Sequence, residues 1–137
     1  MPEHAPNDIL AIVDLGSNSA RMVLYKCYPD GAFKLIDEFR EAVRLAEQIE
    51  SDGALSQRAI DRTIATMSEF ARICAAHRAR PVLAVATAAV RAAANGEALI
   101  EQVAARTGLR LKIISGDEEA RYDFLGVINT LNVADCT

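Results

Sequence analysis

Apolar and polar positions alternate along the first part of the chain in a way that predicts β-strands. A short apolar run at Ile9–Asp14 indicates one strand, and Arg21–Tyr28 places alternate side chains on the two faces of a second. A third strand begins at Phe33, after a Pro-Asp-Gly sequence at 29–31 that is typical of a tight turn with glycine in the left-handed conformation. The second and third strands are therefore predicted to form a hairpin.

Helical spacing replaces this alternation in the middle of the chain. Ser56 is a suitable N-cap for a long helix. The apolar positions that follow it at helical spacing are Ile60, Ile64, Met67, Phe70, Ala71 and Cys74. Pro81 ends this unit, and Val82–Ala86 is predicted to be a short buried strand.

The last third of the chain contains two more helices, a strand and the start of a final helix. Ala88–Ala94 is rich in helix formers, and a further helix covers about Glu97–Arg106, closed by Gly108. Leu109–Ile114 is the next predicted strand. The final helix starts at Gly116, and its inward positions are Phe124, Leu125, Ile128 and Leu131. A hairpin followed by strand–helix units predicts a mixed α/β sheet with helices covering its faces.

Composition and charge narrow the class of protein. Apolar residues make up 51% of the chain, which predicts a folded domain, apart from polar residues 1–8, which are expected to be disordered. No apolar stretch approaches the roughly 20 residues that a membrane span needs, and no signal-peptide pattern is present. The net charge of -4 argues against nucleic-acid binding, which normally uses a basic face.

The cysteines and histidines are too scattered to suggest a metal cluster or a disulfide framework. Cys27, Cys74 and Cys136 contain no CxxC pair, and their odd number favours reduced thiols in a cytoplasmic protein. His4 and His77 lie far apart, so sequence neighbours cannot assemble a zinc site.

The polar loop after the first strand offers several ligand-binding groups. Ligands of open α/β sheets bind beyond the carboxyl ends of strands, where this loop is expected. Gly16 permits close approach of a ligand to the backbone, and Asp14 suits a hydrated Mg²⁺. Donors that suit phosphate oxygens come from Ser17, Asn18 and Ser19. The loop matches neither a Walker A nor a GxGxxG sequence, and an ordinary polar connection explains its composition equally well.

Two further strand ends carry charged residues. Arg91 follows the strand Val82–Ala86 in a helical segment, where it either binds an anion or points into solvent. The Gly-Asp-Glu-Glu sequence at 116–119 places acids at the start of the final helix. Acids stabilise the dipole at such a position in any protein, but one of them could instead orient and deprotonate a water molecule.

Four segments together resemble motifs of the exopolyphosphatase/guanosine pentaphosphate phosphohydrolase family: VDLGSNSARMVL, VRLAE, ATAAVRAAAN and IISGDEEARYDFLGV. That family belongs to the acetate kinase, sugar kinase, Hsp70 and actin superfamily. The resemblance runs from Ile9 to Val127, with the motifs in the expected order and spacing. It implies an α/β fold with a ribonuclease H-like (actin-like ATPase) lobe, in which a mixed five-stranded sheet has its second strand antiparallel to the rest and helices on both faces.

The resemblance also implies a role for each candidate residue. The first phosphate loop contains Gly16, Ser17, Asn18 and Ser19. Asp14 is expected near the metal, Mg²⁺, and Arg91 corresponds to the phosphate-binding arginine of the family. Glu119 corresponds to the general base that activates the attacking water, and Arg21 lies where many members have a basic residue that could bind phosphate.

The implied activity is that of a cytoplasmic, bacterial hydrolase that releases terminal phosphate from inorganic polyphosphate by Mg²⁺-assisted attack of water. Guanosine pentaphosphate is the alternative substrate, and a non-catalytic module that binds polyphosphate or guanosine alarmones is a further alternative. The presence of Glu119 favours catalysis, and the EEAR and ATAAVR motifs favour a phosphatase over a kinase of the superfamily. The expected partners are the substrate and a second copy in a homodimer, with no nucleic acid and no membrane.

Two positions depart from the family pattern, and one expected motif is not in the chain. Ala88 stands where members often have serine, and Ala46 stands where glycine is common. The second phosphate loop of the superfamily, a DxGGGS-type run, is expected shortly after Thr137. Residues 9–137 are therefore expected to form the N-terminal lobe of a longer phosphatase, inactive without the C-terminal part of the same chain.

Overall fold

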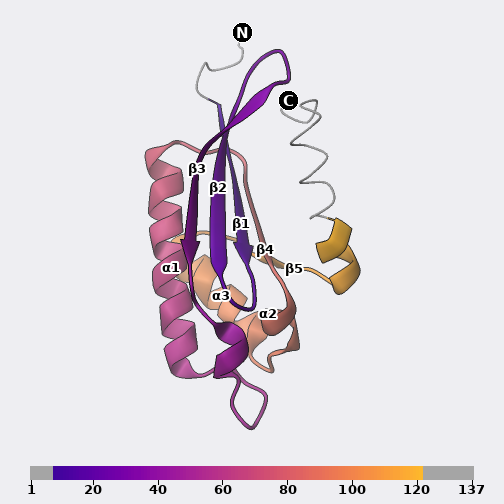
Figure 1. Cartoon of the computed structure of the whole chain (residues 1–137). Coiled ribbons are helices and arrows are strands. Elements are labelled where there is room, and N and C mark those ends of the chain that lie inside the picture. The colour runs from indigo at the N-terminus through magenta and orange to yellow at the C-terminus, as the bar shows by residue number, and fades with distance from the viewer. Residues whose placement is uncertain (1–7, 122–137) are drawn as a thin grey trace.

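Five strands form one mixed sheet in the computed structural model, which describes residues 8–121 (Figure 1). They are β1 (Ile9–Leu15), β2 (Ala20–Cys27), β3 (Phe33–Glu41), β4 (Val82–Ala86) and β5 (Lys112–Ile113). Their order across the sheet is β3-β2-β1-β4-β5. β2 runs antiparallel to β1 and β3, whereas β4 runs parallel to β1 and β5 runs parallel to β4. The second strand therefore opposes all the others, which confirms the expected fold class.

Four helical segments accompany the described part of the sheet: η1 (Leu45–Gln48), α1 (Gln57–Ala76), α2 (Ala88–Ala92) and α3 (Gly96–Thr107). α1 runs along the length of the strands, and it packs beside α3 against the same face of the sheet (Figure 1). Residues 116–121 are also helical, as expected from Gly116 onward. The apolar face expected for that helix, at Phe124, Leu125, Ile128 and Leu131, lies outside the described residues. No helix within 8–121 is long and apolar enough to cross a membrane.

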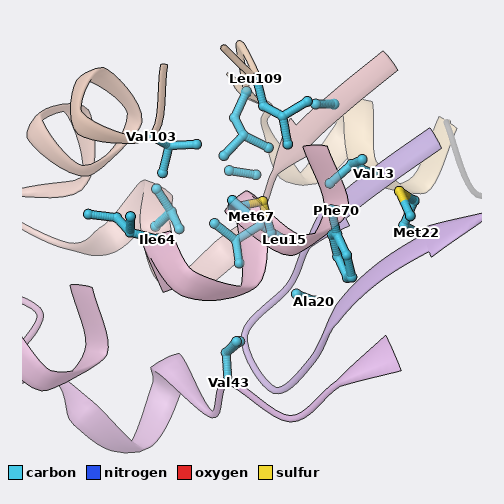
Figure 2. Packing of buried hydrophobic residues seen from close by; sticks show 14 of the residues in the cluster. Val13, Leu15, Ala20, Met22, Val43, Ile64, Met67, Phe70, Val103 and Leu109 are labelled. Carbon is cyan, nitrogen blue, oxygen red and sulfur yellow. The ribbon is translucent and has the colours of Figure 1, made fainter. Parts of the chain in front are cut away.

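The core lies between the sheet and these two helices. On β1, alternate residues point inward, and Val13 and Leu15 have no exposed surface. Figure 2 shows them packed with Met22 of β2 and with α1 side chains that include Met67 and Phe70. Each such side chain contributes about 1.5–3 kcal/mol when it is removed from water, so this single layer of contacts provides much of the stability.

The opposite face of the sheet is open among the described residues. Ile12 of β1 and Leu83 of β4 are neighbours in register, and they are 36% and 52% exposed. Leu35 and Ile36 of β3 are also exposed. The helices expected on both faces are thus described on one face only.

Most predicted boundaries agree with the structure. Ser56 caps α1 by accepting a hydrogen bond from the Ala59 N–H at 3.1 Å, and Gly108 ends α3 with a φ of 82°. The turn glycine, Gly31, has a φ of 88°, as its turn sequence predicted. Helix propensity and capping residues act over a few neighbours, so these features are visible in the sequence.

Two predictions of local structure need correction, and one helix was missed. The last strand is Lys112–Ile113 rather than Leu109–Ile114, because only these two residues pair with β4, while Leu109 is buried in the core. α2 ends at Ala92 rather than Ala94, because Ala93 is extended and the Ala94 N–H donates to Gly53. The helix η1 was not predicted at all.

The cysteine prediction holds for one of the two described residues. Cys74 is a buried free thiol, and burial raises the pKa of that thiol. Cys27, at the end of β2, is disulfide-bonded, so the expectation of reduced thiols is wrong for this residue. The expectation rested on spacing along the chain, which does not report distance in the fold.

Truncation of inward and outward side chains on β1 tests the assignment of the two faces. Leu15→Ala should lower the free energy of unfolding by about 2–5 kcal/mol, because it leaves a cavity in a fully packed layer. Ile12→Ala should lower it much less, because Ile12 is partly exposed on the open face. Urea denaturation measures both values, and equal losses would contradict the assignment.

Candidate active site

The candidate site is built where segments from three strands meet. β1 and β4 are parallel, so their carboxyl ends lie at the same edge of the sheet, and the β1–β2 loop and α2 follow these ends directly. The Thr87 N–H donates to the Leu15 carbonyl at 3.1 Å, and Arg91 donates to the Ile114 carbonyl, just after β5, at 2.6 Å. Three strand ends that are distant in sequence are therefore joined by hydrogen bonds, as expected for a ligand site in such a sheet.

The β1–β2 loop is a tight turn whose carbonyls are bonded to its surroundings. Its ends are joined by the Gly16 N–H, which donates to the Ser19 carbonyl at 3.0 Å. The carbonyls of Ser17 and Asn18 accept hydrogen bonds from N–H groups after β3, each at 2.9 Å. In residues 8–121, no acceptor binds the N–H of Ser17, Asn18 or Ser19. These three donors are available to an anion, the arrangement expected of a phosphate cradle.

Gly16 is needed in this turn for a steric reason. A Cβ atom at this position would lie 3.1 Å from the Ser19 carbonyl oxygen, closer than most side chains allow. The same Cβ would lie 4.0 Å from the hydroxyl oxygen of Thr87. The glycine thus avoids a close contact with the Ser19 carbonyl and lets the turn stay narrow.

The segment after β3 supports the loop through an unusual backbone conformation. Arg44 is left-handed, with φ 52° and ψ 47°, which directs its N–H to Asn18 and the N–H of Ala46 to Ser17. Nothing in the sequence predicted this, because arginine does not favour that conformation. The backbone of Ala46 has no positive φ, so glycine is not required there and this departure from the family pattern leaves the loop intact.

Asn95 holds the following part of this segment in place. Its side chain accepts from the Leu55 N–H at 2.9 Å and donates to the Leu55 carbonyl at 3.1 Å, across 40 residues of sequence. The start of α3 is thereby fixed to the residue that precedes the N-cap of α1. This amide is a positioning group that the sequence analysis did not identify.

Asp14 and Arg21 lie opposite each other on β1 and β2, next to the loop. Arg21 is engaged by Glu38 of β3, with Nε and Oε2 3.1 Å apart, and Arg40 reaches the same carboxylate. Arg21 is therefore close to the loop in sequence and register, but its charge is directed to Glu38.

Arg91 and Glu119 come together from two different strand ends. Their guanidinium and carboxylate groups are 3.9 Å apart, and both side chains are somewhat more than one-third exposed. Arg91 is held by its bond to the Ile114 carbonyl, which orients the guanidinium group. The structure thus pairs the two residues that the sequence named for anion binding and proton transfer.

The neighbouring acid, Glu118, has a structural role instead. Glu118 and Ser115 form a capping box: the Glu118 N–H donates to the Ser115 hydroxyl at 3.0 Å, and the Glu118 carboxylate accepts from the Ser115 N–H at 2.9 Å. This N–H bond, with Lys112 nearby, lowers the pKa of Glu118. Glu118 is thus occupied by the helix start, and Glu119 is left facing Arg91.

Comparison with known proteins identifies relatives by sequence and by fold. The sequence profile of the Ppx/GppA phosphatase family matches residues 26–136. The chain belongs to this family. The profile begins after the β1–β2 loop, but the crystal structure of the Aquifex aeolicus Ppx/GppA family member covers 88% of the chain, with a TM-score of 0.82 and 31% identity. The expected family and fold are therefore confirmed.

Named relatives include both branches of the family. Exopolyphosphatase 1 of Mycobacterium leprae is 32% identical over 118 residues, which are 86% of this chain and 35% of the relative. A guanosine-5'-triphosphate,3'-diphosphate pyrophosphatase of Pseudoalteromonas atlantica is 31% identical over 130 residues, 95% of this chain and 26% of the relative. The chain thus spans about a third or less of the length of these curated relatives.

The capping role of the Glu118 carboxylate can be tested through the pH dependence of the free energy of unfolding. Glu118→Ala should destabilise the protein at pH 7, because the Ser115 N–H loses its acceptor. The pKa of Glu118 is lowered by folding, so its contribution is present at neutral pH and is lost as the pH falls through that lowered pKa. Urea denaturation of the two proteins should therefore differ at pH 7 and converge in strong acid. A difference that persists in acid would contradict the role of the carboxylate charge.

Proposed function

We propose that the natural protein hydrolyses the terminal phosphoanhydride bond of inorganic polyphosphate. The observation that carries this proposal is the Arg91–Glu119 pair, held at a strand end beside a loop with three available N–H donors. Hydrolysis of a phosphate chain needs cationic and N–H donors to bind the anion, and next to them a carboxylate to take a proton from the attacking water. The exopolyphosphatase named among the relatives supports the choice of substrate.

Each residue has a distinct part in this reaction. The N–H groups of Ser17, Asn18 and Ser19 bind and orient phosphate oxygens, and Gly16 keeps the approach open. Arg91 binds the reacting phosphoryl group and stabilises its charge through a planar, charge-assisted fork. Glu119 accepts a proton from the water as its oxygen attacks phosphorus, and the shortened polyphosphate leaves. Positioning and electrostatics supply most of the rate enhancement in such chemistry.

Mg²⁺ is the proposed cofactor, with Asp14 as its protein ligand. Among the described residues, no three His, Cys, Asp or Glu side chains gather around a single point, so the protein offers no closed cage. A single carboxylate fits Mg²⁺, which keeps several waters and takes its other ligands from phosphate oxygens. When bound, the ion would neutralise charge on the phosphate chain. The roles of Asp14 and Arg21, the boundary at residue 9 and the homodimer stay predictions.

Guanosine pentaphosphate is the second candidate substrate, because one relative carries the name of that activity. Its 5′-triphosphate end presents the same terminal anhydride to the same groups. Phosphate release from the two compounds, measured side by side with the natural protein, separates the candidates. Binding of either compound without any release would instead support a non-catalytic module.

Replacement of the proposed base tests catalysis directly. Glu119→Gln should lower kcat by roughly 10²–10⁴-fold, the usual contribution of general-base catalysis, with little change in substrate affinity. Glu118→Gln is the matched control, and its effect should be small, because Glu118 serves the capping box and glutamine also fits that motif. Equal losses of kcat in the two variants would refute the assignment of the base.

Replacement of Arg91 tests substrate binding. Arg91→Ala should raise KM for polyphosphate, and Arg91→Lys should recover only part of the affinity, because an ammonium group lacks the planar fork of arginine. Arg72→Ala provides the control, since that arginine lies exposed on α1 and pairs with Glu69. Unchanged kinetics for Arg91→Ala would show that Arg91 does not face the substrate.

A further inference from the structure

Thr87 occupies the position between β4 and α2, directly beside the phosphate loop. The residue is only 4% exposed. Its N–H donates to the Leu15 carbonyl at 3.1 Å, and its carbonyl accepts from the Arg91 N–H at 2.9 Å. The backbone of Thr87 is therefore fixed to the end of β1 on one side and to the Arg91 turn on the other.

The hydroxyl of Thr87 does not make the bond that its position leads one to expect. A threonine at a helix N-cap normally accepts from the N–H two or three residues later. Here no such capping bond forms, because the N–H of Ala89 donates to the Ser17 hydroxyl at 3.1 Å instead. The hydroxyl of Ser17, in the β1–β2 loop, therefore caps α2, and the Thr87 side chain makes no capping bond.

The Thr87 hydroxyl, which makes no capping bond, lies next to Gly16 of the turn. It has no hydrogen-bond partner within residues 8–121, and its oxygen would be 4.0 Å from a Cβ atom placed on Gly16. A hydroxyl is both a donor and an acceptor, and one without a protein partner is available to a ligand. The adjacent residue, Ala88, has no polar side chain to offer.

We propose that Thr87 is a further phosphate-binding residue, whose hydroxyl donates a hydrogen bond to the phosphate group held by the Gly16–Ser19 loop. The proposal rests on the proposed function, since it needs a phosphate in that loop. It assigns to Thr87 the contact that Ala88 cannot make.

The test compares the affinity of three variants for tripolyphosphate with Mg²⁺, by isothermal titration calorimetry of the natural protein. All are made in a Glu119→Gln background, so that the probe is not consumed. Thr87→Val keeps the shape and removes the hydroxyl, and affinity should fall roughly 10- to 100-fold, as expected for one hydrogen bond to an anion. Thr87→Ser restores the hydroxyl and should bind as the background does.

Thr63→Val is the matched control. The hydroxyl of Thr63 is buried and without a partner in the described part of the chain, and it lies within α1. Thr63→Val should therefore leave affinity unchanged, and the melting temperatures of all variants verify that each is folded. If Thr87→Val is unfolded, the comparison of Thr87→Ala with Thr87→Ser takes its place.

The outcomes separate this inference from the proposed function. Binding by the background with equal affinity in Thr87→Val overturns the role of Thr87 and leaves the proposed function standing. An equal loss of affinity in Thr63→Val also overturns it, because removal of a hydroxyl on α1, outside the β1–β2 loop, would then have the same effect. Failure of the background itself to bind tripolyphosphate overturns both. Loss in Thr87→Val with recovery in Thr87→Ser supports the inference.

Discussion

Ser17 makes two hydrogen bonds on which the geometry of the site depends. Its hydroxyl accepts from the Ala89 N–H at the start of α2, and its carbonyl accepts from the Ala46 N–H after β3. With its acceptors used in this way, the loop directs its donors outward, toward any anion at the strand end. A serine that caps a helix to which it does not belong thus holds the loop, α2 and the segment after β3 in one arrangement.

A similar principle governs the acidic side of the site. The capping box between Ser115 and Glu118 fixes how the helical residues 116–121 begin, and therefore how they are rotated. Adjacent residues of a helix point about 100° apart, so the rotation that uses Glu118 for capping turns Glu119 toward Arg91. The Ser115 N–H binds the Glu118 carboxylate, and this hydrogen bond determines which of the two neighbouring glutamates faces Arg91.

The sequence predicted the parts of this protein whose causes are local. The spacing of apolar residues predicted β1, which contains Ile12. Single-residue preferences predicted the N-cap of α1 at Ser56 and the glycine that ends α3. The roles of Arg91 and Glu119 were implied by the family motifs, whereas their contact was not predicted, because spacing alone places each at a strand end without joining them. Arg44, Asn95 and Thr87 escaped prediction, since their roles depend on a left-handed backbone and on contacts across the fold.

The hydrogen bonds that build the site connect residues far apart along the chain. Ser17 and Ala89 are separated by 72 positions, and Leu55 and Asn95 by 40. Each such contact closes a long loop, and the entropy cost of closure is offset only after the two ends have formed their hydrogen bond. By contrast, α1 and the β2–β3 hairpin form from residues that are near neighbours in sequence. During synthesis on the ribosome, the loop at Gly16–Ser19 therefore emerges well before the helix that it caps. We expect the nascent chain to form its helices and hairpin first and the geometry of the candidate site last.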